Sequence, residues 1–171
     1  IAQKKFLGDM NTNKKYAIML YLSGMEEPHI KGFGALEHHE STSVVLPEMM
    51  PKDAIDKTIT DVVSHEFFHT VNPLKTHSEE IHYFDYADPK MSQHLWMYEG
   101  GTEYFANLFQ IQEGLITKDE FLQRMSEKIA NSKNYNDTMP FTVMSKNVLK
   151  NEYKDQYRNV YEKGALLAMC L

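Results

Sequence analysis

The most constraining feature of this sequence is the segment at residues 65–69, which reads His-Glu-Phe-Phe-His. On an α-helix, residues four apart lie one above the other, so His65 and His69 can direct two imidazoles to one metal ion. Glu66 would then flank a water molecule bound to that ion. The segment therefore requires a helix, and it predicts a zinc site of the kind that metallopeptidases use to activate water.

The residues around this segment favour the helix that it requires. Apolar residues recur with helical spacing before it, at positions 55, 59, 62 and 63. Pro51 and Pro73 bracket a helix of ordinary length. The alternative is a pair of structural histidines, and it is disfavoured because a chain of this composition gives only roughly 0.03 chance matches to the pattern. We therefore predict that His65 and His69 bind zinc and that Glu66 acts as the base.

The rest of the pattern predicts a β-rich beginning followed by helices. Residues 14–22 are expected to form a buried strand, residues 31–38 an extended segment and residues 43–46 a second strand. Further helices are expected over residues 92–112 with Gly114 as the stop, from a capping box at residues 117–120 to about residue 132, and from residue 155 onward. Residues 133–140 are expected to be a polar loop. Strands followed by helices, without alternation, predict the α+β fold class.

Length and composition limit the class of protein. A chain of 171 residues fits one domain, and its net charge of −6 without a basic cluster argues against nucleic acid as a partner. The longest apolar runs, at residues 16–22 and 165–171, fall short of the roughly 20 residues that a membrane span needs. Because the chain begins at Ile1 and stops inside an apolar helical pattern, we expect a piece of a larger soluble protein. A bacterial cytoplasm or periplasm is the expected compartment, and the oligomeric state is not indicated.

A catalytic zinc ion takes three protein ligands and leaves one position open for water. The two histidines therefore need a partner downstream. Spacing alone does not choose among nine candidates, which are His77, Glu79, Glu80, His82, Asp85, Asp88, His94, Glu99 and Glu103.

Two segments resemble the gluzincin clan of peptidases, and within it the chain is most similar to the glycyl aminopeptidase family. They are residues 65–72, His-Glu-Phe-Phe-His-Thr-Val-Asn, and residues 95–105, Leu-Trp-Met-Tyr-Glu-Gly-Gly-Thr-Glu-Tyr-Phe. The resemblance implies a thermolysin-like zincin catalytic domain, with an N-terminal β-domain before it and a C-terminal PDZ domain after it. It also implies that Glu99, from the Trp-x-x-Glu-Gly pattern, is the third zinc ligand.

Two more segments extend the resemblance to about residues 30–171. Residues 34–38, Gly-Ala-Leu-Glu-His, resemble the family's Gly-x-x-Glu-His segment and the edge-strand motif of the aminopeptidase N family. This implies that the backbone at Gly34 and Ala35 pairs with substrate and that Glu37 binds the free α-amine. Residues 159–165, Asn-Val-Tyr-Glu-Lys-Gly-Ala, resemble the family's Tyr-x-Lys-Gly-Ala segment. This implies that Tyr161 stabilises the transition state.

Some positions depart from the family pattern or stay open. Val71 stands where the family commonly has Trp, Gly101 where it has Phe, and His39 where it often has Arg, which puts the substrate preference in question. Glu103 lies one helical turn after Glu99. It is a candidate for orienting a zinc-bound imidazole, with a surface position as the alternative.

These observations predict a zinc metallo-aminopeptidase that hydrolyses the first bond of peptides. The resemblance implies a preference for a small first residue, Gly or Ala. One alternative is a zinc endopeptidase, in which Glu37 is incidental. Another is a peptide-binding protein that keeps the metal site without turnover.

Overall fold

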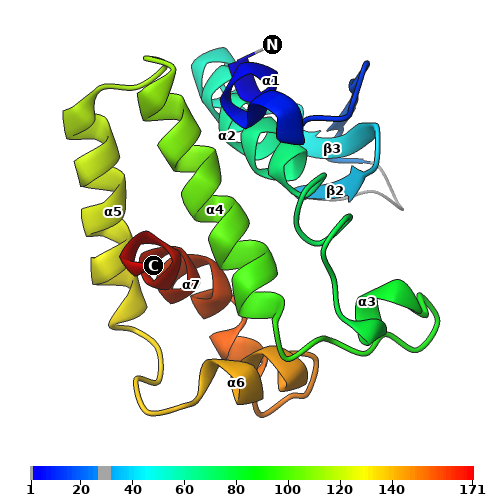
Figure 1. Ribbon diagram of the computed structural model, residues 1–171. Helices are drawn as coiled ribbons and strands as arrows, with labels where there is room; N and C mark the ends of the chain where they lie inside the picture. The colour runs from blue at the N-terminus through cyan, green and yellow to red at the C-terminus, as the bar shows by residue number, and fades with distance from the viewer. Residues whose placement is uncertain (1, 27–31) are drawn as a thin grey trace. The chain divides into compact units, whose positions relative to one another are not determined.

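The chain forms two compact units, Ile1–Leu74 and Lys75–Leu171. The computed structural model describes residues 2–26 and 32–171 (Figure 1). The first unit contains a small three-stranded sheet and a long helix, and the second is helical. The predicted α+β class is therefore confirmed. Lys31, the first residue of the predicted extended segment, lies outside the described residues.

The sheet of the first unit positions one long helix. Its strands β1 (Ala17–Ser23), β2 (Gly34–His38) and β3 (Ser41–Pro47) lie in the order β1-β3-β2, with β1 parallel and β2 antiparallel to β3. Every second side chain of β3 is buried, and Val44 and Leu46 pack with Val63 of helix α2 (Lys52–Phe68). This alternation is that of a strand with one face on a core. Helix α2 therefore lies against the sheet with a fixed face (Figure 1).

One expectation for the first fifty residues is wrong. The strand predicted at residues 14–22 exists as β1, but it is not buried, since Ile18 is 50% and Met19 53% exposed. Among the described residues, β1 is an edge strand that pairs only with β3, and α2 packs against β2 and β3. A continuous apolar run indicates a strand but not which layer covers it. A short helix α1 (Ala2–Leu7) and a 3₁₀ turn η1 (Gly8–Met10), for which no prediction was made, precede the sheet.

The second unit is built around helix α4 (Leu95–Gln112), which packs against α5 (Lys118–Ser132), α6 (Phe141–Asn147) and α7 (Asn159–Cys170) (Figure 1). A core cluster of Leu95, Met144, Val148 and Val160 joins α4, α6 and α7. The capping box is confirmed, because the Thr117 side chain accepts from the Glu120 amide and the Glu120 side chain accepts from the Thr117 amide. Gly114, at φ 70°, ends α4 as expected.

Other boundaries in this unit differ from the predicted ones. Helix α4 begins three residues later than expected, and a 3₁₀ turn η2 (Lys154–Gln156) precedes α7 where one helix was predicted from residue 155. The short helices α3 (Glu79–His82) and α6 were not predicted, because a few turns of helix carry little periodic signal. Over the two described ranges, no helix has the length and apolar character that crossing a membrane requires.

Helices α4 and α7 touch through their backbones at two glycines. A Cβ atom added at Gly100 would lie 2.3 Å from the carbonyl carbon of Gly164, and one added at Gly164 would lie 2.7 Å from the Trp96 carbonyl oxygen. No larger residue fits at this crossing without a backbone shift. The close approach brings neighbouring side chains of the two helices together, including Glu99 on α4 and Tyr161 on α7.

Candidate active site

The predicted metal-binding residues lie at the buried end of α2. His65, Glu66 and His69 are all buried, and the two imidazole rings are edge to face with centroids 4.7 Å apart. Helix α2 ends at Phe68, and His69 follows it with helical backbone angles of φ −60° and ψ −20°. The four-residue spacing therefore keeps both imidazoles on one side of the helix end, as the motif requires.

A backbone contact sets the tautomer of His69. Its Nδ1 atom lies 2.9 Å from the carbonyl oxygen of Asn72. A carbonyl oxygen can only accept, so Nδ1 carries the proton and Nε2 carries the lone pair. Metal-binding histidines are commonly oriented by this kind of contact on the nitrogen that does not bind the metal. The turn after α2 therefore prepares His69 to act as a ligand through Nε2.

Strand β2 brings Glu37 to the same end of the helix. Glu37 pairs with Thr42 in the β2–β3 ladder, and its side chain is half-buried. One ligand atom from each of Glu37, Glu66 and His69 lies within 4.8 Å of the others. Two carboxylates this close create a negative local potential that attracts a cation, whether a metal or an ammonium group.

The strand that carries Glu37 also has an open edge. Gly34 and Ala35 pair with Val45 and Val44 of β3, and β2 is the outer strand of the sheet on this side. Within the part of the chain that the structure describes, the other edge of β2 has no neighbouring strand. An extended peptide can pair with such an edge through its backbone.

In the helical unit, the structure brings Glu99 and Tyr161 together. Both side chains are half-buried. Burial, followed by the negative charge of Glu99 and a contact with Tyr157, raises the pKa of the Tyr161 phenol. The phenol is therefore a neutral hydrogen-bond donor at neutral and mildly alkaline pH. The crossing of α4 and α7 at the two glycines explains why these two residues meet.

Tyr157 is a residue at this place that the sequence did not single out. Its hydroxyl oxygen lies 3.3 Å from that of Tyr161, and the two rings are edge to face with centroids 5.8 Å apart. Tyr157 is 37% exposed, whereas Tyr161 packs against the core cluster of the helical unit. The sequence signal for this pair was the spacing of four residues between Tyr157, just before α7, and Tyr161, in its first turn.

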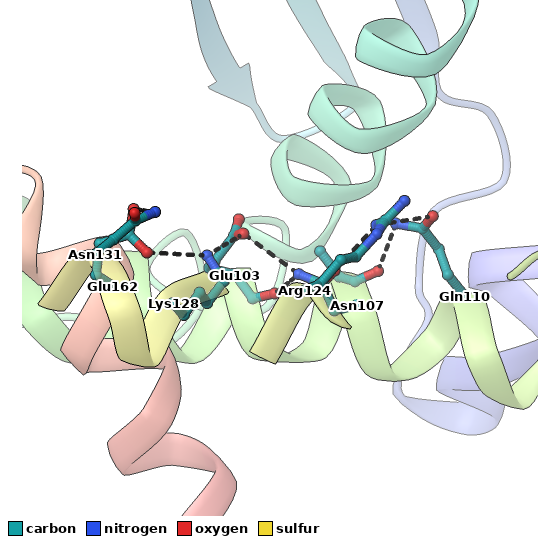
Figure 2. Close-up of polar contacts among 8 residues, drawn as sticks. Glu103, Asn107, Gln110, Arg124, Lys128, Asn131 and Glu162 are labelled. Carbon is teal, nitrogen blue, oxygen red and sulfur yellow. Dashed lines mark hydrogen bonds and ion pairs between the residues drawn. The ribbon is translucent and has the colours of Figure 1, made fainter. Parts of the chain in front are cut away.

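Glu103 is held by a polar network among α4, α5 and α7 (Figure 2). Its Oε1 atom lies 2.8 Å from Nζ of Lys128 and accepts from the Asn107 side-chain amide at 3.3 Å. Lys128 also lies 4.0 Å from Glu162, and Arg124 donates to Asn107 at 3.0 Å. The Lys128 side chain is only 13% exposed and that of Glu103 24%. Glu103 is therefore fixed among the three helices, one turn after Glu99.

Comparison with known proteins places the chain among peptidases. The sequence pattern of the family described as M61 glycyl aminopeptidase matches residues 58–167. This range includes residues 65–69, Glu99 and Tyr161 and ends before Leu171. No curated protein matches the chain significantly.

The fold is similar to that of a solved aminopeptidase N family protein from Idiomarina loihiensis. The TM-score is 0.71 and the sequence identity 22%, over 91% of this chain and 28% of that protein. At this identity the similarity concerns the fold. The chain spans about a quarter of the length of that relative.

Proposed function

Because this chain belongs to the M61 glycyl aminopeptidase family, we propose that it is the catalytic part of a zinc-dependent aminopeptidase with a thermolysin-like zincin fold. The reaction is hydrolysis of the first peptide bond of a peptide with a free N-terminus. The observation that carries this proposal is the cluster of Glu37, Glu66 and His69, whose ligand atoms lie within 4.8 Å of one another. It combines a base, a histidine with the tautomer of a ligand, and an acidic group suited to an ammonium ion.

The residues proposed to hold zinc are His65, His69 and Glu99. Their fit is supported by the paired imidazoles at the end of α2 and by the Nδ1 contact of His69 with a backbone carbonyl. Glu99 is proposed from the resemblance of residues 95–105 to the family. Glu103 is proposed to orient one of the histidines. When bound, zinc would supply Lewis acidity to the scissile carbonyl and lower the pKa of water.

Two residues of the chain, Glu66 and Tyr161, have separate roles in the proposed hydrolysis. Glu66 accepts a proton from the attacking water and returns it to the leaving amine. Tyr161 donates a hydrogen bond to the oxyanion of the tetrahedral intermediate. Because its pKa is raised, the Tyr161 phenol keeps that proton over the working pH range. This contact is made mainly in the transition state and therefore accelerates the reaction rather than only strengthening binding.

The restriction to the first residue is proposed to come from β2. Glu37 pairs with the α-ammonium of the substrate, and the strand backbone at Gly34 and Ala35 pairs with the peptide. The charge of two neighbouring carboxylates supports binding of a cationic N-terminus. A small first residue, Gly or Ala, is the preference implied by the family. The remaining parts of the full protein are proposed to be an N-terminal β-domain and a C-terminal PDZ domain.

This proposal is tested by comparing a free peptide with its N-acetylated form, using the full-length protein. We expect rapid cleavage of the free peptide and slow cleavage of the blocked one. Glu37→Ala should lower kcat/KM for the free peptide by about 10²-fold, because a desolvated ammonium ion loses its partner, and should change the blocked peptide little. Rapid cleavage of blocked peptides by the unaltered enzyme would instead identify an endopeptidase.

A further inference from the structure

Tyr16 is held firmly beside the proposed active site in the first unit. It directly precedes β1, and the next residue, Ala17, donates a backbone hydrogen bond to Glu40 at 2.9 Å and pairs with Ser41. Its ring packs edge to face on Phe67, with centroids 5.0 Å apart. Phe67 is buried and lies in the zinc-binding motif between Glu66 and His69. The Tyr16 side chain is therefore fixed by the same helix end that carries the base.

The hydroxyl group of Tyr16 interacts with Thr42 but forms no hydrogen bond of normal geometry within the described residues. Its oxygen is buried. Leaving a buried hydroxyl in this state is unfavourable, so such groups are rare and call for an explanation. A phenylalanine would make the same ring contact with Phe67 without this penalty. The oxygen is therefore explained best by a partner that arrives with a ligand.

The surroundings of the hydroxyl indicate which ligand group it meets. Burial and then the nearby carboxylates of Glu66 and Glu37 raise the pKa of the Tyr16 phenol, while a hydrogen-bonding interaction with the Thr42 side chain lowers it. The phenol thus stays neutral next to two negative charges, and a negative ligand group is repelled there. A primary ammonium group fits, since it brings positive charge and three N–H donors. The Glu37 carboxylate can accept one of these donors, and the lone pair of the phenol oxygen can accept another.

We propose that Tyr16 is a substrate-binding residue that holds the free α-ammonium group of the peptide together with Glu37. This inference rests on the proposed aminopeptidase function and adds a second recognition element to it. The carboxylate supplies the charge, and the phenol oxygen supplies a directional acceptor on a rigid ring. Two fixed acceptors position the substrate N-terminus better than one, so Tyr16 contributes to the choice of the first peptide bond.

The test uses Tyr16→Phe, which removes one oxygen and keeps the ring on Phe67. Binding is measured in the full-length, metal-loaded protein carrying Glu66→Gln, so that the peptide is not consumed. We expect Tyr16→Phe to weaken binding of a free peptide roughly tenfold or more and to leave its N-acetylated form unchanged. When Glu37→Gln is already present, Tyr16→Phe should cost less, because both residues act on one group.

Two controls separate recognition from structure. The thermal midpoint of Tyr16→Phe should equal or exceed that of the parent protein, since the change removes a buried hydroxyl that lacks a hydrogen bond of normal geometry. Tyr86→Phe, at a phenol that is 81% exposed, should alter neither binding nor stability.

The possible outcomes distinguish the inference from the proposed function. If the parent protein binds free and acetylated peptides equally, recognition of the amine is absent and the proposed function fails. If the parent discriminates and Tyr16→Phe discriminates as strongly, the inference alone is overturned. Equal weakening of binding of both peptides by Tyr16→Phe would show that the hydroxyl does not act on the amine and would also overturn the inference.

Discussion

Glu66 is the residue whose chemical role can be isolated most cleanly. Replacing it by Gln preserves size and hydrogen bonding but removes the ability to accept a proton. We expect Glu66→Gln to lower kcat by roughly 10³-fold or more, with the zinc content unchanged. Elemental analysis of the purified variant alongside its turnover makes the comparison. Near-normal turnover in a variant that retains its metal would remove Glu66 from the role of base.

Tyr161 should behave as a donor to the transition state. Tyr161→Phe is expected to lower kcat by about 10²-fold with little change in KM, as is typical when one oxyanion donor is lost. Tyr157→Phe is the matched variant, because it removes the neighbouring hydroxyl 3.3 Å away and leaves that of Tyr161 in place. Its effect on kcat should be much smaller. Equal effects of the two changes, or a loss confined to KM, would argue against the assigned role.

The residues of the proposed site differ in how well their roles could be predicted from the sequence. The spacing of His65 and His69 is visible because helical periodicity is a local property. Tyr16 and Tyr157 carry no local pattern of this kind. Tyr16 comes near Glu37 and Glu66 through the pairing of β1 with β3 and the packing of α2 on the sheet. Contacts of this kind depend on tertiary structure, so they cannot be predicted from the sequence of one segment.

At the scale of helices, the network around Lys128 holds α4 and α5 together and reaches α7. Lys128→Met keeps the aliphatic stem but leaves the carboxylates of Glu103 and Glu162 without their shared cation. Because this cation is largely buried, its loss should reduce the free energy of unfolding by about 2 kcal/mol or more, as measured by denaturant unfolding.

The matched control for this prediction is Lys52→Met. Lys52 forms an exposed ion pair with Asp56 on α2, and its side chain is 84% exposed. Exposed pairs of this kind are worth less than about 1 kcal/mol. If the two substitutions lower the free energy of unfolding equally, the network around Lys128 does not stabilise the packing of the three helices as described.

Elements with strong periodic signals were predicted well, and their burial was predicted less well. Helices α2, α4 and α5 follow from apolar spacing, flanking prolines and the capping box at Thr117. Strand β1 was located but wrongly expected to be buried, because the apolar run at Ile18 and its neighbours says nothing about sheet order. The contact of Gly100 with Gly164 likewise joins segments that are far apart in sequence.

At the scale of the whole chain, membership of the family covers both units. The matched residues begin within α2 and end within α7, so they include the end of the sheet-bearing unit and nearly all of the helical unit. The ligands proposed for zinc come from both, with the histidines on α2 and its end and Glu99 on α4. Binding of one metal by these three residues is the central proposal about the molecule.

The most direct test of that claim is anomalous scattering at the zinc edge from crystals of the full-length protein. We predict one strong peak with His65, His69 and Glu99 as its three protein ligands, each N or O atom at about 2.0–2.2 Å. Glu99→Gln should weaken the peak, and loss of zinc to a chelator should abolish peptide cleavage until zinc is returned. A peak bound by Glu37 in place of Glu99, or no peak at the two histidines, would contradict the account.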